Sequence, residues 1–352
     1  MTDNAEPSDT PGWDAMTAAL RALYPGQEPK HYGTVIKYRI GGPDPIDGIS
    51  VYRVRGPVDH WHYITFGFSE LYQKESDNPE VSGFGFELTF RLECGPEGEP
   101  PLFACNFLQN LARYVFDSGN IFEAGHHMDL NGPIMVEADT AISAICFTED
   151  PKLPEIATPN GRLRFLQVVG ITTEELLALK AWNTNGFLEI LKRDRPLLTT
   201  DLGRTSILGD PAAADELAAR AKAEGSSTDA LYVSEIKFAG SGLLGRRFTW
   251  CVGAHQIAAI AAVLPGRVCH DRPFWVIGAN GSVEFLLGRK PGVKREGPDL
   301  KVTLTADLAE LMAADLKPLR GDYTWPDFPG FTVTVERSEI RDNEGNVVQT
   351  IG

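Results

Sequence analysis

Two histidines one residue apart, His60 and His62, are the first candidates for chemistry in this sequence. They open an aromatic, β-branched run that predicts a strand at 61–68, in which side chains two residues apart point to the same face. Two imidazoles on one face could bind a metal ion, or could form hydrogen bonds inside a core. We expect the structural role, because no third ligand follows at a fixed spacing.

A second pair, His126-His127, follows Gly125 in a glycine-flanked loop, where adjacent side chains usually diverge. We expect a solvated or partner-contacting tip there. A zinc site needs three or four converging ligands, and the sequence has no H-E-x-x-H motif to supply them. The cysteines are scattered without C-x-x-C spacing: Cys94, Cys105, Cys146, Cys251 and Cys269.

Other catalytic motifs are also missing from the sequence. It contains no G-x-S-x-G nucleophile turn and no G-x-x-x-x-G-K-[ST] phosphate loop. The acid pairs Glu149-Asp150 and Glu174-Glu175 fall at loop and helix-start positions, where carboxylates cap backbone amides or face water. We therefore predict no catalysis and no bound cofactor or metal. A metal-dependent hydrolase using His60, His62 and either His126 or His127 remains the alternative.

Length and charge limit the partners. The 352 residues, 43% of them hydrophobic, predict a globular protein of about two domains. Lys plus Arg number 33 and Asp plus Glu 48, a net charge of −15 that repels nucleic acid and acidic lipid. A protein or peptide that is neutral or basic is the expected partner. An odd, scattered set of five cysteines and an acidic, polar N-terminus predict a cytoplasmic location, and nothing predicts an oligomeric state.

The first part of the chain mixes both periodicities. Phe84 to Leu92 alternate apolar and polar residues, which predicts a strand with one buried face, and residues 34–40 have the β-branched and aromatic composition typical of a strand. Apolar residues at helical spacing predict helices at 13–23 and 100–116. Further strands are expected at 49–53, 142–147 and 163–169, and further helices at 173–182 and 186–191.

The second part begins after an Ala-rich, charged helix expected at 210–224, where Gly225 opens a flexible stretch. We predict a disordered segment at 1–11 and domains at 12–225 and 226–352. The fold class is α+β, each domain a mixed or mostly antiparallel sheet packed with helices, with a cleft between them. The second domain is expected to hold a helix at 307–316 and strands at 231–238, 247–252, 274–277, 283–287, 300–304 and 331–335.

Several ordered blocks carry a family resemblance. The blocks at 41–47, 51–53, 60–67, 69–72, 82–92, 111–116 and 148–151 closely resemble the N-terminal domain of the Suppressor of fused family. Blocks at 165–170, 173–176 and 181–183 continue it, and 245–250 with 304–326 resemble the second domain more weakly.

The resemblance implies a function. Animal members of this family are non-catalytic cytoplasmic regulators that close two domains over an extended peptide, which is added as a strand. The resemblance implies these partner-binding residues: Tyr114, Phe122, Gly125, His126 and His127, with Leu243, Leu244 and Phe248 from the second domain. By residue type alone, Tyr114 at a helix end could equally be a core aromatic.

One block departs from the family pattern. Where animal members carry Gly-Asp-His, this chain has Gly125-His126-His127, so a histidine stands in place of the acid. The chain also lacks the long insertion of the animal second domain, and so resembles the compact bacterial members. For those members the family association is with immunity proteins that neutralise polymorphic toxins. A regulator that sequesters a transcription factor is the alternative.

Overall fold

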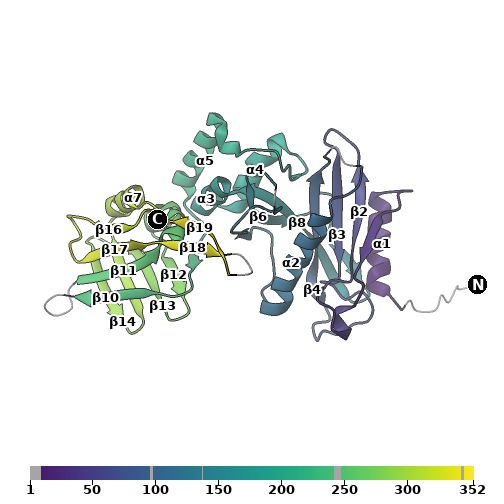
Figure 1. Cartoon of the computed structure of the whole chain (residues 1–352), viewed down its shortest axis with the longest axis horizontal. Helices are drawn as coiled ribbons and strands as arrows, with labels where there is room; N and C mark the ends of the chain where they lie inside the picture. Colours follow the sequence, from purple (N-terminus) through teal and green to yellow (C-terminus); the bar gives the residue numbers. More distant parts are fainter. Residues whose placement is uncertain (1–8, 96–97, 137, 242–246, 342–344) are drawn as a thin grey trace, which may run out of the picture. The chain divides into compact units, whose positions relative to one another are not determined.

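The structure, a computed structural model, describes residues 9–95, 98–136, 138–241, 247–341 and 345–352. Two compact units divide the chain (Figure 1). Unit 1 holds the described residues up to Thr173 together with Leu188–Ser206, and unit 2 holds Glu174–Phe187 and the described residues from Ile207 onward. Of the segment 1–11 that the sequence predicts to be disordered, residues 1–8 lie outside the described part, and a helix begins at Pro11.

Unit 1 is built around one eight-stranded sheet in the order β1-β2-β3-β4-β8-β6-β5, with β7 paired to β8. Strands β4 and β8 are parallel, and the other neighbours are antiparallel. The strands are β1 (Lys30–Gly33), β2 (Gly48–Val54), β3 (His60–Phe66), β4 (Val81–Glu93), β5 (His127–Asp129), β6 (Ile142–Glu149), β7 (Ile156–Thr158) and β8 (Gly161–Thr172).

Helices α1 (Pro11–Leu23) and α2 (Leu102–Ser118) cover opposite faces of this sheet. Ile64 and Phe66 of β3 pack with α1, whereas Tyr63, which precedes them, packs with α2. Alternate residues of one strand therefore enter two separate cores. Short helices complete the connections along the chain: η1 (Tyr38–Ile40), α3 (Thr173–Ala181), α4 (Thr184–Asp194) and η2 (Ile207–Gly209).

Strand β4 differs from its prediction in one respect. The alternation expected for Phe84 to Leu92 is present, but the polar residues do not face water. Glu87 and Thr89 are fully buried and Arg91 is 1% exposed, because both faces of the sheet are covered. The prediction of a single buried face was wrong, and the second face holds buried polar groups that must be paired.

The composition of residues 34–40 predicts a strand, but the structure shows none there. Strand β1 ends at Gly33, before this segment, and residues 38–40 form the 3-10 turn η1. Because no strand of the described sheet pairs with 34–37, its apolar side chains are left at the surface.

Unit 2 contains two larger sheets and a two-stranded ribbon, in the orders β10-β11-β17-β16, β14-β15-β13-β12-β9 and β18-β19. Helices and mixed sheets in both units confirm the predicted α+β class. The strands are β9 (Ala230–Tyr232), β10 (Lys237–Ser241), β11 (Arg247–Gly253), β12 (Phe274–Gly278), β13 (Gly281–Leu287), β14 (Gly292–Glu296), β15 (Asp299–Leu304), β16 (Gly321–Thr324), β17 (Phe331–Glu336), β18 (Ser338–Arg341) and β19 (Val347–Ile351), and the helices are α5 (Pro211–Glu224), α6 (Ala254–Val268) and α7 (Ala306–Asp315). Helix α5, expected ahead of the boundary at Gly225, thus groups with unit 2.

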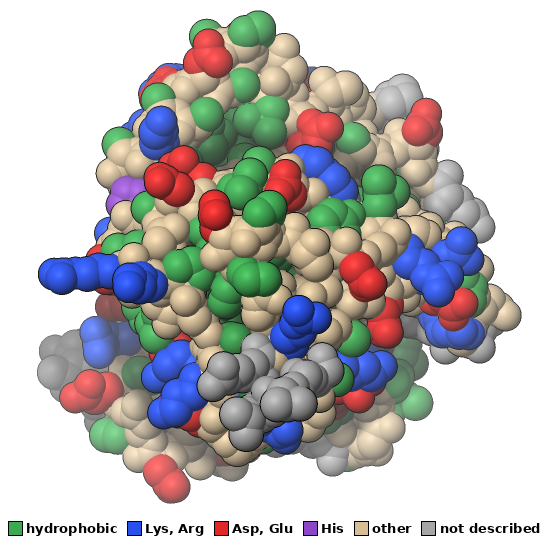
Figure 2. Space-filling view, turned by 90° about the vertical axis from the view of Figure 1, so that its left-hand side faces the viewer, with side chains coloured by type: hydrophobic (Ala, Val, Ile, Leu, Met, Phe, Trp, Pro, Cys, Tyr) green, Lys and Arg blue, Asp and Glu red, His purple; other side chains and the backbone are tan. Residues whose placement is uncertain are grey.

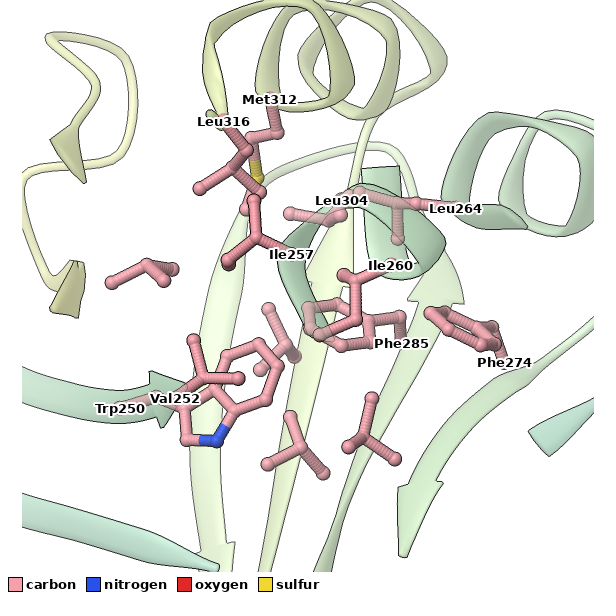
Figure 3. Close-up of a cluster of buried hydrophobic side chains, with 14 of the residues drawn as sticks. Trp250, Val252, Ile257, Ile260, Leu264, Phe274, Phe285, Leu304, Met312 and Leu316 are labelled. Atoms are coloured by element: carbon pink, nitrogen blue, oxygen red, sulfur yellow. The ribbon is translucent and has the colours of Figure 1, made fainter. Parts of the chain in front are cut away.

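Helix α6, which was not among the predicted elements, lies in the core of unit 2. Its Ile257, Ile260 and Leu264 belong to the same buried cluster as Trp250 and Phe285, and Ile260 lies next to the Phe285 ring (Figure 3). The two ring centroids are 5.7 Å apart. In the face shown in Figure 2, hydrophobic, acidic and basic side chains are interspersed, as on a solvated surface.

We expect Phe285→Ala to destabilise unit 2 by about 3–5 kcal/mol, the usual cost of emptying a packed aromatic site. Leu311→Ala, an exposed apolar residue on α7, is the control and should change stability by about 0.5 kcal/mol or less. Urea unfolding followed by circular dichroism measures both. Equal effects of the two changes would contradict the packing described.

Candidate partner-binding site

Strand β5 forms one end of the unit 1 sheet. Its three residues pair with β6, His127 opposite Cys146 and Asp129 opposite Ala144. Within the described residues, the other edge of β5 has no strand partner. An open edge presents backbone N–H and C=O groups that can pair with an added extended segment.

An aromatic stack runs from α2 to β6, the strand that pairs with β5. The Tyr114 ring lies 5.7 Å from that of Phe122, and Phe122 lies 4.3 Å from Phe147, with interplanar angles of 17° in both pairs. Phe122 is buried, whereas 41% of Tyr114 is exposed. Gly119 caps α2 with a φ of 73° and turns the chain so that Phe122 meets Tyr114. Tyr114 is therefore the exposed end of a stack that continues into the core.

The loop before β5 is fixed by backbone hydrogen bonds. The Gly125 N–H donates to the Phe147 carbonyl over 2.8 Å, and the Phe147 N–H donates to the His126 carbonyl over 2.9 Å. The Glu123 N–H donates to Nδ1 of His126 over 3.3 Å. A neutral His126 therefore carries its proton on Nε2, and this exposed ring presents a donor to solvent.

Charges of both signs flank the loop. Arg164 lies between two carboxylates, 3.7 Å from Glu123 and 3.6 Å from Glu149. Burial raises the pKa of Glu149 above its usual value, and the charge of Arg164 opposes that shift. The surroundings of His126 thus contain two acids and one base.

The first histidine pair has a structural role. His62 is fully buried, with Nδ1 2.7 Å from the Tyr24 hydroxyl and Nε2 3.2 Å from Asp150 Oδ2. His60 directs Nδ1 at the Val58 carbonyl, 2.9 Å away. Burial and the charge of Arg91 lower the pKa of His62 to about 4, so it is neutral at pH 7.

Asp150 is the centre of this buried network. Arg91 holds it with two hydrogen bonds of 2.5 and 2.9 Å, and Thr89 donates over 2.7 Å. Asp150 also accepts the N–H groups of Lys152 and Leu153, so the capping role expected for Glu149-Asp150 is found at the second acid. Burial acts to raise the pKa of Asp150, but His62 and Arg91 hold it well below its usual range.

The structure separates the four histidines considered for a metal. His60 and His62 lie inside the unit 1 core, and His126 and His127 lie at the loop and edge of β5. In the part of the chain that the structure describes, no group of three or more His, Cys, Asp and Glu side chains is placed to hold a metal ion. The same residues include no helix long and apolar enough to cross a bilayer.

The predicted unit 2 residues divide into two groups. Leu243 and Leu244 lie outside the described residues. Phe248 lies in β11 between Gly240 of β10 and Phe331 of β17, and its partly buried side chain packs against the unit 2 core.

In unit 1, Tyr114, Phe122 and the loop before β5 come together. Phe147, which completes the stack, was missed, although the strand that carries it was predicted.

Comparison with known proteins identifies the family. The family model of the Suppressor of fused protein (SUFU) matches residues 42–205. A chain of the Sufu-Fu complex crystal structure is 32% identical, covering 60% of this chain and 98% of that chain, with a TM-score of 0.56. The chain belongs to the Suppressor of fused family.

Two further comparisons define the extent of the similarity. The Suppressor of fused homologs of Mus musculus and Homo sapiens are each 42% identical over 212 residues, or 55% of this chain and 43% of each relative. The alignment thus spans less than half the length of these curated relatives. The crystal structure of Drosophila Suppressor of Fused covers 93% of this chain and 97% of that chain, with a TM-score of 0.74 and 22% identity, and shows a shared fold.

We expect Arg91→Met to lower the free energy of unfolding by about 3–5 kcal/mol at pH 7, because it leaves the Asp150 carboxylate buried without its cation. The lowered pKa of Asp150 means that the Arg91 contribution is fully present above about pH 4 and is lost as the pH falls. The gap between wild type and variant in urea unfolding should therefore be smaller at about pH 2.5 than at pH 7.

Arg162→Met is the matched control, since Arg162 is exposed and lies 3.6 Å from Glu80 and 3.8 Å from Glu155. It should cost about 1 kcal/mol or less. If both variants lose a similar amount of unfolding free energy, the buried ion pair stabilises the fold no more than an exposed one does.

Proposed function

We propose that the chain is a non-catalytic binding protein that accepts an extended segment of a protein partner as an added strand on β5. The single observation that carries this proposal is the open edge of β5, preceded by a segment whose Phe122 stacks on the exposed ring of Tyr114. The occurrence of a related chain in the Sufu-Fu complex supports protein binding as the activity.

The site contains the two components that strand addition uses. Main-chain groups along an open edge provide affinity for any extended segment, while side chains beside the edge select among segments. Tyr114 offers a ring already held by Phe122, so little side-chain entropy is lost on contact. The Nε2–H of neutral His126 favours a hydrogen-bond acceptor on the partner.

Binding between the two domains is the second part of the proposal. The family resemblance supports it by assigning Leu243, Leu244 and Phe248 of the second domain to the same partner. Phe248 is only partly buried in unit 2, which leaves part of its ring available for contact.

The partner class that we propose for a bacterial chain is a polymorphic toxin, which would make the chain an immunity protein. A net charge of −15 favours a neutral or basic partner surface. Co-expression with the product of the neighbouring gene tests this role. Rescue of growth from a toxic neighbour supports immunity, whereas capture of a transcription factor from the native host supports the alternative regulator.

Tyr114→Ala should weaken partner binding about tenfold or more, as expected for an aromatic anchor. The measurement is quantitative mass spectrometry of proteins captured from the native host by wild type and variant. Tyr232→Ala removes a tyrosine that is 75% exposed in unit 2 and is the control. If all three proteins capture the same partners in equal amounts, Tyr114 is not part of the site.

A further inference from the structure

A second surface of unit 1 has the features of a docking groove. A cavity of about 490 Å³ opens beside the end of α2. The Phe116 ring lies 5.0 Å from Phe84 and 5.5 Å from Tyr38, and these rings form its apolar wall. We call this cavity the aromatic groove; Phe68 and Tyr72 extend its lining.

Two carboxylates hold the polar wall of the aromatic groove in place. Glu87, fully buried, accepts the N–H of Gly67 at 2.8 Å, and both the N–H at 3.0 Å and the hydroxyl at 2.7 Å of Ser69. Glu70 accepts the N–H groups of Glu75 at 2.7 Å and Ser76 at 2.5 Å, among other donors. Burying carboxylates is costly unless they are bonded, so the loop at 67–76 is fixed before any partner arrives.

The segment that contributes Tyr38 to the aromatic groove exposes apolar side chains. Val35 is fully exposed, and Ile36, Tyr38 and Ile40 are 51%, 41% and 78% exposed. Four large exposed hydrophobic residues thus fall within six consecutive positions. Contiguous apolar exposure of this kind is typical of interaction sites.

Charge beside the aromatic groove indicates the partner. Asp47, Glu70 and Glu75 are among its lining residues. Lys37 places its ammonium 4.5 Å from the centroid of the Tyr72 ring and 4.0 Å from Asp47 Oδ2. The chain's own lysine thus shows how a cation is held by an aromatic ring and a carboxylate at this position.

We propose that the aromatic groove docks an extended protein segment carrying a large apolar side chain next to a lysine or arginine. The apolar side chain would enter among Tyr38, Phe84 and Phe116, and the basic side chain would meet the carboxylates of Asp47 and Glu75. The groove lies apart from the open edge of β5 in the sheet, and its docking role does not depend on strand addition there.

The test uses a library of random 12-residue peptides displayed on phage, selected against the full chain. Enriched peptides are synthesised, and their affinity is measured by fluorescence anisotropy. We expect sequences that pair an aromatic or branched apolar residue with Lys or Arg. Tyr38→Ala and Glu75→Lys should each weaken their binding about tenfold, and the two exposed positions should leave folding intact, as checked by thermal melting.

Leu102→Ala is the matched control, because Leu102 is an exposed apolar residue at the other end of α2, and it should leave the affinity unchanged. Failure to enrich any peptide, or enriched peptides insensitive to both groove variants, would overturn the proposal. So would a dimer of this chain that Tyr38→Ala dissociates in sedimentation, because a second copy would then be the occupant. Tyr114→Ala separates the two sites, since it should leave these peptides bound.

Discussion

The buried pair of Arg91 and Asp150 is the constraint on which unit 1 depends. It joins β4 to the turn that follows β6, and His62 on β3 and Gln167 on β8 join the same network. Four segments of unit 1 are therefore joined through one buried ion pair. A charge so deeply buried is tolerated only when all its partners are in place, so the network favours one strand register over its alternatives. That register determines which edge is left open at β5.

The local pattern predicted the elements well where apolar periodicity was strong. The α2 helix expected at 100–116 is found at Leu102–Ser118, and the alternating strand at 84–92 lies inside β4. Helix α6 was not predicted, and it contains Pro265 followed by glycine in its last turn. Its stability comes from burial in the unit 2 core, and sequence periodicity does not report that.

The site was predictable only in part. Residue patterns alone did not choose between a core and a surface role for Tyr114, and the resemblance to Suppressor of fused supplied its grouping with Phe122. The neighbours of His62 are far away in sequence, 38 positions to Tyr24 and 88 to Asp150, so no local signal could reveal that its two nitrogens face a hydroxyl and a carboxylate. The exposed segment at 34–40 has the composition of a strand, and its conflict with the observed loop became visible only once β1 was known to end at Gly33.

The last turn of α2 carries both Tyr114 and Phe116. Residues two apart on a helix diverge by about 200°, so one ring turns toward Phe122 and the other toward Phe84. Fraying of this single turn would withdraw both rings at once. Apparent affinity at each surface scales with the fraction of molecules in which the turn is formed. A substitution that loosens the cap at Gly119 would thus weaken two unrelated ligands by the same factor, without touching either.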